Sequence, residues 1–367
     1  MKKKFIVAGE LSGDITAAWY IEKKNLKADA YLYGVGGEHM AAHGVELVRR
    51  YYDLNITGVL EVVAHLPRIF RIMRELVAYV VAGGFDEVIL VDFPGFNIRF
   101  AARLKKIMPN IIVTYVAPPQ MWCWGAWRVR KIRRYFDNVV VLYPFEEAWY
   151  KERGVRAQWI GCSTYDAMEP YMHDEVEKEP LIALIPGSRT SEIHRLASLI
   201  VGVAQVLHDK YPMMRFVMPL ASSLSEDFIK KSLKDAGLQL DSFPLAFVRG
   251  DAEKYHVLQR CCLAVTKPGT VTLELALLDV PSVVFFKISM ASFLLAWFLV
   301  KVKYMSLPNL LLHKRLLPEA VQRNCTVEYI VTQSLPIIDS FLARGDYHRT
   351  FLQEITQLRG LLSFKKN

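Results

Sequence analysis

The sequence has no uninterrupted apolar stretch long enough to cross a membrane. Its richest apolar run, Phe293–Val300, is well short of the roughly 20 residues that a spanning helix needs. Cysteine is also sparse: the 5 cysteines among 367 residues follow no regular spacing, which excludes a disulfide scaffold and indicates a reducing compartment. The apolar part of the basic N-terminus ends at Glu10, too early for a signal peptide. We therefore expect a cytoplasmic protein.

Several chemical signatures are missing as well. There is no Asp-x-Asp, His-Glu-x-x-His or Cys-x-x-Cys motif, and the 9 histidines are scattered, so we predict no metal site. The Gly-x-Gly-x-x-Gly dinucleotide fingerprint, the Gly-Lys-Ser/Thr ending of a phosphate loop and the Gly-x-Ser-x-Gly nucleophile elbow are also absent. We predict no cofactor, and the sequence disfavours an ATPase, a kinase or an α/β-hydrolase.

The sequence does combine an excess of positive charge with apolar character. Its net charge is +9, from 46 lysines and arginines against 37 acidic residues, and its mean hydropathy is +0.17. A hydrophobic content of 52% is too high for a disordered chain, and the length suits two domains. The expected partner is anionic, apolar or both, so nucleic acid, a membrane surface and an anionic small substrate all remain open.

Short apolar runs alternate with helical stretches along both halves of the chain. The predicted strands are 4–8, 88–91, 111–116 and 139–142 in the first half, and 181–185, 215–218, 245–248, 263–266 and 282–286 in the second. Helices are predicted at 66–81 and 350–362, and the acidic, proline-bounded segment 169–180 is the predicted linker. Continuous apolar strands separated by helices indicate an α/β fold of two doubly wound domains with a cleft between them.

The candidate sites are the junctions at which a strand ends and a helix begins. The first junction follows strand 4–8, where Gly13 permits a tight turn with free N–H groups that can face an anion, beside Glu10 and Ser12. Capping of the helix by Ser12 or Asp14 explains the same residues equally well.

The second junction carries a carboxylate. Asp92 directly follows strand 88–91 and precedes a Pro-Gly turn, so its side chain should project into the cleft. A carboxylate there can be the general base that activates a hydroxyl nucleophile. Alternatively, Asp92 caps the helix that begins near Asn97 or closes the turn.

The third junction, in the second half, is suited to phosphate. Gly187 and Ser188 offer backbone N–H groups at a helix start, and Arg189 adds a cation whose planar fork fits phosphate oxygens. An arginine at a helix start opposes the helix dipole, which favours a ligand role for it.

The fourth junction repeats this arrangement at Gly269 and Thr270. Glu274, one turn further, can accept hydrogen bonds from ribose hydroxyls, although a threonine cap followed by a solvated glutamate is as common. The two junctions together favour a nucleoside diphosphate.

Two segments, 65–74 and 289–304, combine cations with apolar side chains and suit an anionic membrane surface. The predicted membrane or acyl contacts are Leu66, Ile69, Phe70, Met73, Phe293, Trp297 and Phe298. Core packing of the first segment and burial of the second between domains are the alternatives. A third basic run, 127–134, can bind nucleic acid or a phosphate headgroup, or form the solvated face of a helix.

A set of short motifs also occurs in a fixed order along the chain. They are Ala8–Asp14, Gly34–Gly37, Gly58–Val62, Val91–Asn97, Trp122–Trp124 with Arg128, Pro144–Glu146, Pro186–Arg189 with Glu192, Gly269–Glu274 and Tyr304–Asn309. In this order they resemble the lipid-A-disaccharide synthase family, inverting glycosyltransferases of lipid A assembly in Gram-negative bacteria. The resemblance extends from the N-terminus to about residue 325.

The resemblance implies a GT-B fold with two Rossmann-like domains. Residues 1–168 would form the acceptor and lipid domain and residues 181–345 the UDP-sugar domain, with a helix in 346–367 that packs back on the first domain. The implied reaction is metal-independent and inverting. UDP-2,3-diacylglucosamine donates its sugar to 2,3-diacylglucosamine 1-phosphate, which gives a β(1→6) disaccharide 1-phosphate and UDP.

The family's roles carry over to matching residues. Asp92 matches the proposed base that takes the proton of the acceptor hydroxyl, and Arg189 matches the arginine on the UDP side. Glu274 and Asn309 would hold the nucleoside part, together with the turns at Gly187, Ser188, Gly269 and Thr270. Glu10, Ser12, Gly13 and Asn97 would line the substrate cleft.

The resemblance further implies peripheral attachment to the anionic cytoplasmic face of the inner membrane, and a homodimer that swaps C-terminal parts; nucleic acid is not expected. The chain departs from the family pattern at Gly95, Cys162 and Pro268, where members usually have an acidic residue, a histidine and a serine. The alternatives are another UDP-sugar enzyme of this fold, such as an epimerase, and a non-catalytic basic protein that binds membrane or nucleic acid.

Overall fold

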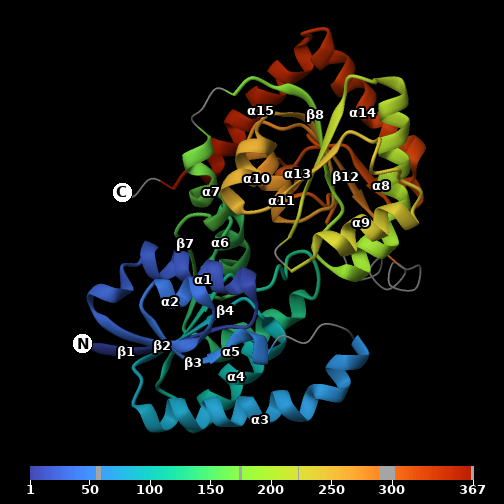
Figure 1. Cartoon of the computed structure of the whole chain (residues 1–367). Helices are drawn as coiled ribbons and strands as arrows, with labels where there is room; N and C mark the ends of the chain where they lie inside the picture. Colours follow the sequence, from blue (N-terminus) through green and yellow to red (C-terminus); the bar gives the residue numbers. More distant parts are fainter. Residues whose placement is uncertain (55–58, 173–175, 222, 289–301, 365–367) are drawn as a thin grey trace. The chain divides into compact units, whose positions relative to one another are not determined.

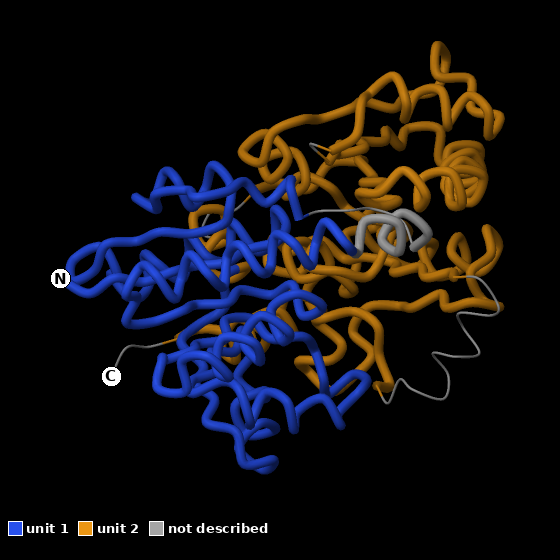
Figure 2. The backbone as a smooth tube through the Cα atoms, turned by 90° about the horizontal axis from the view of Figure 1, so that it is seen from below, with its two compact units in different colours: residues 1–163, 299–301 blue, residues 164–298, 302–367 orange. Residues whose placement is uncertain are grey.

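The computed structural model describes residues 1–54, 59–172, 176–221, 223–288 and 302–364, and for residues 59–66 it describes the backbone only. The chain divides into two compact units, which Figure 2 shows in different colours. Unit 1 contains residues 1–163, and unit 2 contains the described residues from 164 onwards.

Unit 1 is built on a seven-stranded parallel sheet with the order β3-β2-β1-β4-β5-β6-β7. Its strands are β1 (Lys2–Ala8), β2 (Ala30–Gly36), β3 (Val45–Arg50), β4 (Glu87–Val91), β5 (Ile112–Val116), β6 (Asn138–Val141) and β7 (Ala157–Trp159). Its α-helices are α1 (Leu11–Lys23), α2 (Glu38–Ala42), α3 (Val59–Gly83), α4 (Pro94–Ile107), α5 (Val129–Tyr135) and α6 (Pro144–Lys151). Figure 1 shows these helices around the sheet, with α3 as a long rod.

The sheet of unit 1 is buried on both faces. Phe5 and Val7 of β1 belong to one core cluster, and Ile6 and Ala8 belong to another. This alternation follows from the two-residue period of a strand, whose successive side chains point to opposite faces. The continuous apolar runs therefore form parallel strands under helices, which confirms the prediction of an α/β fold.

Unit 2 repeats the plan with a six-stranded parallel sheet in the order β10-β9-β8-β11-β12-β13. Its strands are β8 (Glu179–Ile185), β9 (Arg215–Pro219), β10 (Leu245–Val248), β11 (Cys261–Thr266), β12 (Ser282–Phe286) and β13 (Glu319–Val321). Its α-helices are α7 (Ser163–Met168), α8 (Thr190–Lys210), α9 (Glu226–Asp235), α10 (Asp251–Leu258), α11 (Thr270–Leu277), α13 (Leu307–Leu312), α14 (Val327–Leu342) and α15 (Asp346–Leu362). Both sheets place the first strand of their unit in the middle, as doubly wound folds do.

Two elements differ from the sequence-based expectation. The predicted helix 66–81 is only part of α3, which begins at Val59 and continues through Pro67. The predicted linker 169–180 lies inside unit 2, because the chain passes from one unit to the other between residues 163 and 164. The predicted C-terminal helix is present as α15, with the expected buried face of Phe351, Ile355, Leu358 and Leu362. In unit 2 it packs against α11, α13 and α14, and its docking on the first domain stays a prediction.

Among the residues that the structure describes, no helix has both the length and the apolar character needed to cross a membrane.

Candidate active site

The loops that follow β1 and β4 lie side by side in unit 1. The two strands are neighbours in the sheet, and Ala8 pairs with Val91 at their carboxyl ends. The ring of Phe93 packs so closely over Gly9 that a Cβ atom at that glycine would overlap it. Gly9 therefore allows the two loops to meet. Glu10, in the loop after β1, and Asp92, in the loop after β4, lie at the same edge of the sheet.

Asp92 and Phe93 both have left-handed backbone conformations, with φ of 47° and 44°. For residues other than glycine this costs about 1–2 kcal/mol each. Hydrogen bonds hold the conformation: the Asp92 N–H donates to Val116 at 3.0 Å, and the Asp92 carbonyl accepts from the Tyr115 hydroxyl at 3.0 Å and from Asn97 Nδ2 at 2.8 Å. Strain that the surroundings maintain in this way is typical of functional sites.

The Asp92 carboxyl group is harder to ionise than an ordinary aspartate. Burial of the half-buried side chain raises its pKa to about 6, and the nearby Glu10 carboxylate adds to the rise. A hydrogen bond from the Phe93 N–H acts in the opposite direction. A carboxylate with a pKa near 6 is a stronger base than a solvated one and is still mostly ionised at pH 7.

The other predicted residues of this edge have different environments. Asn97 is 0% exposed, and its Nδ2 donates to the Val91 carbonyl at 3.0 Å as well as to that of Asp92. It therefore positions the loop. Gly13 is buried against β1, whereas Ser12 is exposed. No side chain caps α1, so the capping alternative for Ser12 and Asp14 is wrong.

Asp14 has a role that the sequence did not reveal. Its fully buried carboxylate accepts hydrogen bonds from the backbone N–H groups of Gly37, His39 and Met40, at 2.6, 3.0 and 3.2 Å. These groups lie at the start of α2, so Asp14 anchors the loop between β2 and α2 to α1.

In unit 2 the two predicted phosphate turns lie next to each other. They follow β8 and β11, which are neighbouring strands paired at Ile185 and Thr266. The backbone N–H of Lys267 donates to the Ile185 carbonyl at 3.2 Å and so continues the pairing into the turns. Four predicted residues at these turns are exposed and accessible to a ligand: Ser188, Arg189, Gly269 and Thr270.

A buried carboxylate organises the first turn. Gly187 has φ of 130°, and a Cβ atom there would overlap the side chain of Glu192, so only glycine suits this position. Glu192 accepts a hydrogen bond from the Ser188 N–H at 3.3 Å and from the Lys267 ammonium group at 2.5 Å. The site thus contains a second cation, Lys267, in addition to Arg189. The sequence patterns did not single out Lys267.

Glu274 and Asn309 already have partners within unit 2. Glu274 lies 3.5 Å from the Lys254 ammonium group, and burial raises the pKa of this glutamate. Asn309 is 0% exposed; its amide nitrogen donates to Leu317 and Glu319, and its oxygen accepts from the N–H groups of Leu316 and Leu317. Asn309 therefore holds the segment before β13 in place, and its contact with a nucleoside stays a prediction.

The predicted apolar contacts divide into three groups. Met73 is 1% exposed and belongs to the core of unit 1, so it takes no part in an exposed apolar surface. Ile69 and Phe70 are half-buried on α3, and the Arg103 guanidinium lies 5.3 Å from the centre of the Phe70 ring. The side chain of Leu66, and the residues Phe293, Trp297 and Phe298, lie outside the described part of the chain.

Glu146 is a further buried carboxylate near the carboxyl ends of the strands in unit 1. It accepts hydrogen bonds from the Tyr143 N–H at 3.0 Å and from Trp122 Nε1 at 2.8 Å, and burial raises its pKa to about 7. A proline followed two residues later by a glutamate is a helix-start pattern, and this signal could have indicated the bond to Tyr143. The bond to Trp122 joins distant segments and has no such signal.

A family model described as "Lipid-A-disaccharide synthetase" matches residues 4–361, nearly the whole chain. The chain belongs to the lipid-A-disaccharide synthetase family. It is 34% identical over 342 residues to the lipid-A-disaccharide synthase of Geobacter metallireducens, a match that covers 90% of this chain and 86% of the relative. It is 33% identical to the enzyme of Trichlorobacter lovleyi, over 98% of this chain and 92% of the relative. The resemblance seen in the motifs is thereby confirmed, and the protein is a glycosyltransferase of lipid A biosynthesis.

Two solved structures with the same fold are distant from this chain in sequence. The UDP-GlcNAc 2-epimerase of Neisseria meningitidis, solved with UDP-GlcNAc bound, superposes with a TM-score of 0.60 at 12% identity, over 97% of this chain and 100% of that one. The UDP-N-acetylglucosamine 2-epimerase of Rickettsia bellii gives 0.61 at 11% identity, over 98% and 97%. These likenesses confirm the GT-B class of fold for this member of the lipid-A-disaccharide synthetase family.

Proposed function

We propose that this chain transfers 2,3-diacylglucosamine from its UDP derivative to 2,3-diacylglucosamine 1-phosphate, with Asp92 as the general base. The observation that carries the proposal is the Asp92 carboxylate, which stands at the end of a central strand on a strained backbone with a pKa of about 6. Asp92 takes the proton of the acceptor 6-hydroxyl while that oxygen attacks the anomeric carbon. The bond from this carbon to the phosphate oxygen breaks, UDP leaves, and the configuration inverts.

The departing diphosphate carries negative charge that the protein must stabilise. The exposed Arg189 side chain and the N-termini of α8 and α11 offer a cation and free backbone N–H groups for this purpose. Lys267 supplies a second cation beside the same turns. These groups support a reaction in which protein donors alone balance the charge of the leaving group.

The decisive experiment identifies the product. Mass spectrometry of a reaction with both lipid substrates is expected to show the disaccharide 1-phosphate, formed equally well with and without EDTA. Asp92→Asn is expected to lower kcat by about 10²–10⁴-fold and to leave the affinity for UDP unchanged. Asp86→Asn is the matched control, because Asp86 precedes the opposite end of the same strand and is exposed. Release of UDP without a disaccharide, or full activity of Asp92→Asn, would contradict the proposal.

Unit 1 also offers a basic surface for peripheral attachment to the cytoplasmic face of an anionic membrane. Arg49, Arg68 and Arg71 line a hollow of about 410 Å³ beside α3. Glu75 pairs with Arg49 at 2.9 Å and Asp53 pairs with Arg68 at 3.2 Å, so three cations face two carboxylates. Flotation with phosphatidylglycerol vesicles tests this attachment. The double variant Arg68→Glu with Arg71→Glu is expected to lose its binding to the vesicles. Vesicle binding by this variant would contradict the proposed attachment. The dimer with swapped C-terminal parts stays a prediction, which light scattering in solution tests.

A further inference from the structure

Unit 2 contains a second cavity, of about 710 Å³, that is separate from the phosphate turns. Its walls come from the segment before β8, from the turn before β11, from the turn after α11 and from one face of α15. We call it the amino-edge cavity, because Lys178 and Gln259 precede the amino ends of β8 and β11. The phosphate turns follow the carboxyl ends of these same strands, on the order of 20 Å away along β8.

Buried polar atoms without hydrogen-bond partners gather at this cavity. Five such side-chain atoms occur among the residues that the structure describes, and three of them belong to residues that line it: Gln259 Oε1, Asp279 Oδ1 and Arg359 Nε. Folded proteins leave few buried polar groups unpaired, because each costs about 1–3 kcal/mol. Three at one cavity indicate that a bound molecule completes the hydrogen bonding.

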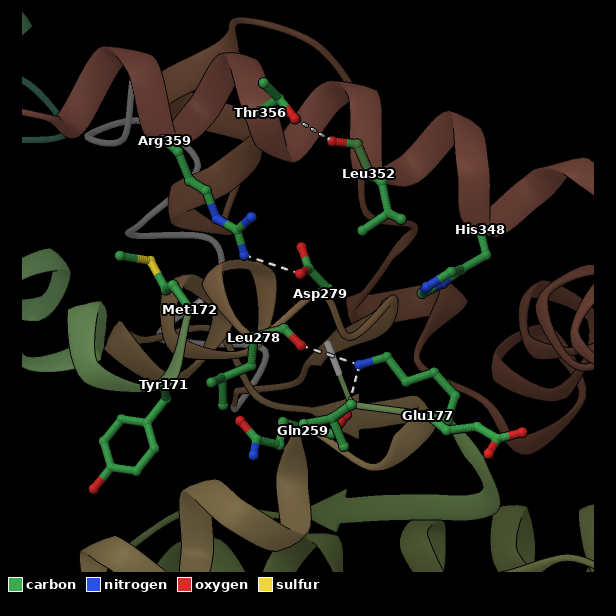
Figure 3. A pocket seen from close by; sticks show the side chains of 12 residues that line it. Tyr171, Met172, Glu177, Gln259, Leu278, Asp279, His348, Leu352, Thr356 and Arg359 are labelled. Carbon is green, nitrogen blue, oxygen red and sulfur yellow. Dashed lines mark hydrogen bonds and ion pairs between the residues drawn. The ribbon is translucent and has the colours of Figure 1, made fainter. Parts of the chain in front are cut away.

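The orientation of these side chains supports a binding site. Figure 3 shows Arg359, from α15, and Asp279, from the turn after α11, pointing toward one another, with Gln259 and Tyr171 across the cavity from the helix. An Arg359 terminal nitrogen lies 2.9 Å from Asp279 Oδ2, which leaves Nε and Oδ1 free. Terminal torsions of Asp and Gln are broad, so small rotations bring Oδ1 and Oε1 toward the cavity without movement of the backbone. Asp279 also has φ of 59°, a strained conformation that is frequent at ligand sites.

A second cation lies at the base of the cavity. The Lys178 ammonium nitrogen donates to the carbonyls of Gln259 at 2.7 Å and Leu278 at 3.0 Å. Among the described residues these two carbonyls are its hydrogen-bond acceptors, so its third N–H is available to an anion. Burial lowers the pKa of Lys178 to about 8, and the positive charge of Arg359 adds a smaller decrease. The Asp279 carboxylate acts in the opposite direction, as a bound anion would.

We propose that the amino-edge cavity binds a small sugar phosphate. The Lys178 ammonium group and Arg359 Nε–H are donors for the phosphate oxygens. Asp279 Oδ1 and Gln259 Oε1 are acceptors, and sugar hydroxyls supply the donors they lack. A bare phosphate satisfies only the cations, and an uncharged sugar satisfies only the acceptors. The cavity volume is within the range of small-molecule sites.

Titration calorimetry of the full chain tests the proposal, with glucose 6-phosphate, inorganic phosphate and glucose as probes. Saturable binding of glucose 6-phosphate is expected, at least about tenfold tighter than either of the other two, and saturating UDP should not displace it. Gln259→Met and Arg359→Met should each weaken the binding at least about tenfold. Gln259 is only 6% exposed and its Oε1 has no hydrogen-bond partner, so Gln259→Met is expected to keep the fold intact.

Arg349→Met is the matched control, since Arg349 is an exposed arginine of the same helix that does not line the cavity. It should bind glucose 6-phosphate as the parent does. Three outcomes would each overturn the proposal: no saturable binding, cavity variants that bind glucose 6-phosphate as tightly as the parent, or inorganic phosphate that binds as tightly as glucose 6-phosphate. Displacement by UDP would also overturn it, because the probe would then occupy the nucleotide turns. None of these outcomes depends on the proposed reaction, because the assay measures binding alone.

Discussion

The ammonium nitrogen of Lys267 lies 2.5 Å from Oε1 of Glu192, and this contact joins the two glycine turns of unit 2. Both side chains are largely buried, with 21% and 11% of their surface exposed. Glu192 also accepts the hydrogen bond from the Ser188 N–H. One ion pair therefore sets the separation of the turns that we assign to the diphosphate.

Replacement of Lys267 by methionine is expected to lower both stability and UDP affinity. The variant leaves the Glu192 carboxylate without its cation, at a cost on the order of 2–3 kcal/mol, less than for a fully buried pair because both groups retain some solvent contact. UDP affinity should fall about tenfold, the effect of losing one charge-assisted contact. Urea denaturation and calorimetry measure the two effects.

The double variant Lys267→Met with Glu192→Gln is the control for this prediction. It removes both charges, so stability should recover toward that of the parent while UDP affinity stays low. If Lys267→Met alone is as stable as the parent, the Lys267–Glu192 ion pair does not stabilise the fold.

The pH dependence of turnover should report on the interaction between Glu10 and Asp92. Because the base must be ionised, kcat is expected to fall as pH drops through about 6, the pKa of Asp92. Glu10→Gln removes one of the two causes that raise this pKa, so the acidic limb should move to lower pH. Glu22→Gln, an exposed substitution at the far end of α1, should leave the profile unchanged. If the acidic limb lies at the same pH in Glu10→Gln and in the parent, Glu10 does not raise the pKa of Asp92.

Loss of the Arg189 guanidinium should weaken UDP binding specifically. Arg189 is exposed at the N-terminal boundary of α8, where its charge opposes the helix dipole, so its removal is not expected to destabilise the fold. Arg189→Ala should raise the Kd for UDP about tenfold or more in calorimetry. Arg195→Ala, an exposed arginine further along α8, should leave that Kd unchanged. Equal Kd values for Arg189→Ala and the parent would place the diphosphate elsewhere.

Two glycines near Asp92 should respond in opposite ways to replacement by alanine. At Gly9 a Cβ atom overlaps the Phe93 ring, so Gly9→Ala should displace the loop of Asp92 and lower kcat at least about tenfold. At Gly95 there is open space around the new Cβ, and the position is in the first turn of α4. Gly95→Ala should therefore raise stability by about 0.5–1 kcal/mol in thermal denaturation and retain activity. Normal turnover in Gly9→Ala would contradict the assigned contact.

The central strands could be predicted from the sequence because their signal is local. The run 282–286 coincides with β12, since a strand buried on both faces is apolar along its whole length. β2 could not be recognised in this way, because Gly34 and Gly36 interrupt its apolar pattern. Gly34 is required there by the close approach of the Ile6 carbonyl on the neighbouring strand, which is a tertiary cause.

The sequence predicted where the candidate-site residues lie along the fold, but it predicted their hydrogen bonds and ion pairs less well. Asp92 and Arg189 could be singled out because each stands where a strand ends and a helix begins, and those positions follow from local patterns. The contacts of Asp14 with residues 37–40 and of Glu192 with Lys267 span 23 to 75 residues of sequence. Such pairs become neighbours only when the sheet forms, so single-sequence patterns do not contain them.

The phenyl ring of Phe93 links the loop of Asp92 to the hydrophobic core of unit 1. Glycine would adopt φ of 44° at this position without the steric penalty of a side chain. The ring, however, packs against the core, lies 5.7 Å from the ring of Phe96 and covers Gly9, so its contacts offset that penalty. A mutation that loosens the core beneath Phe93 is therefore expected to disturb the position of the Asp92 carboxylate, although it touches neither the loop nor a substrate.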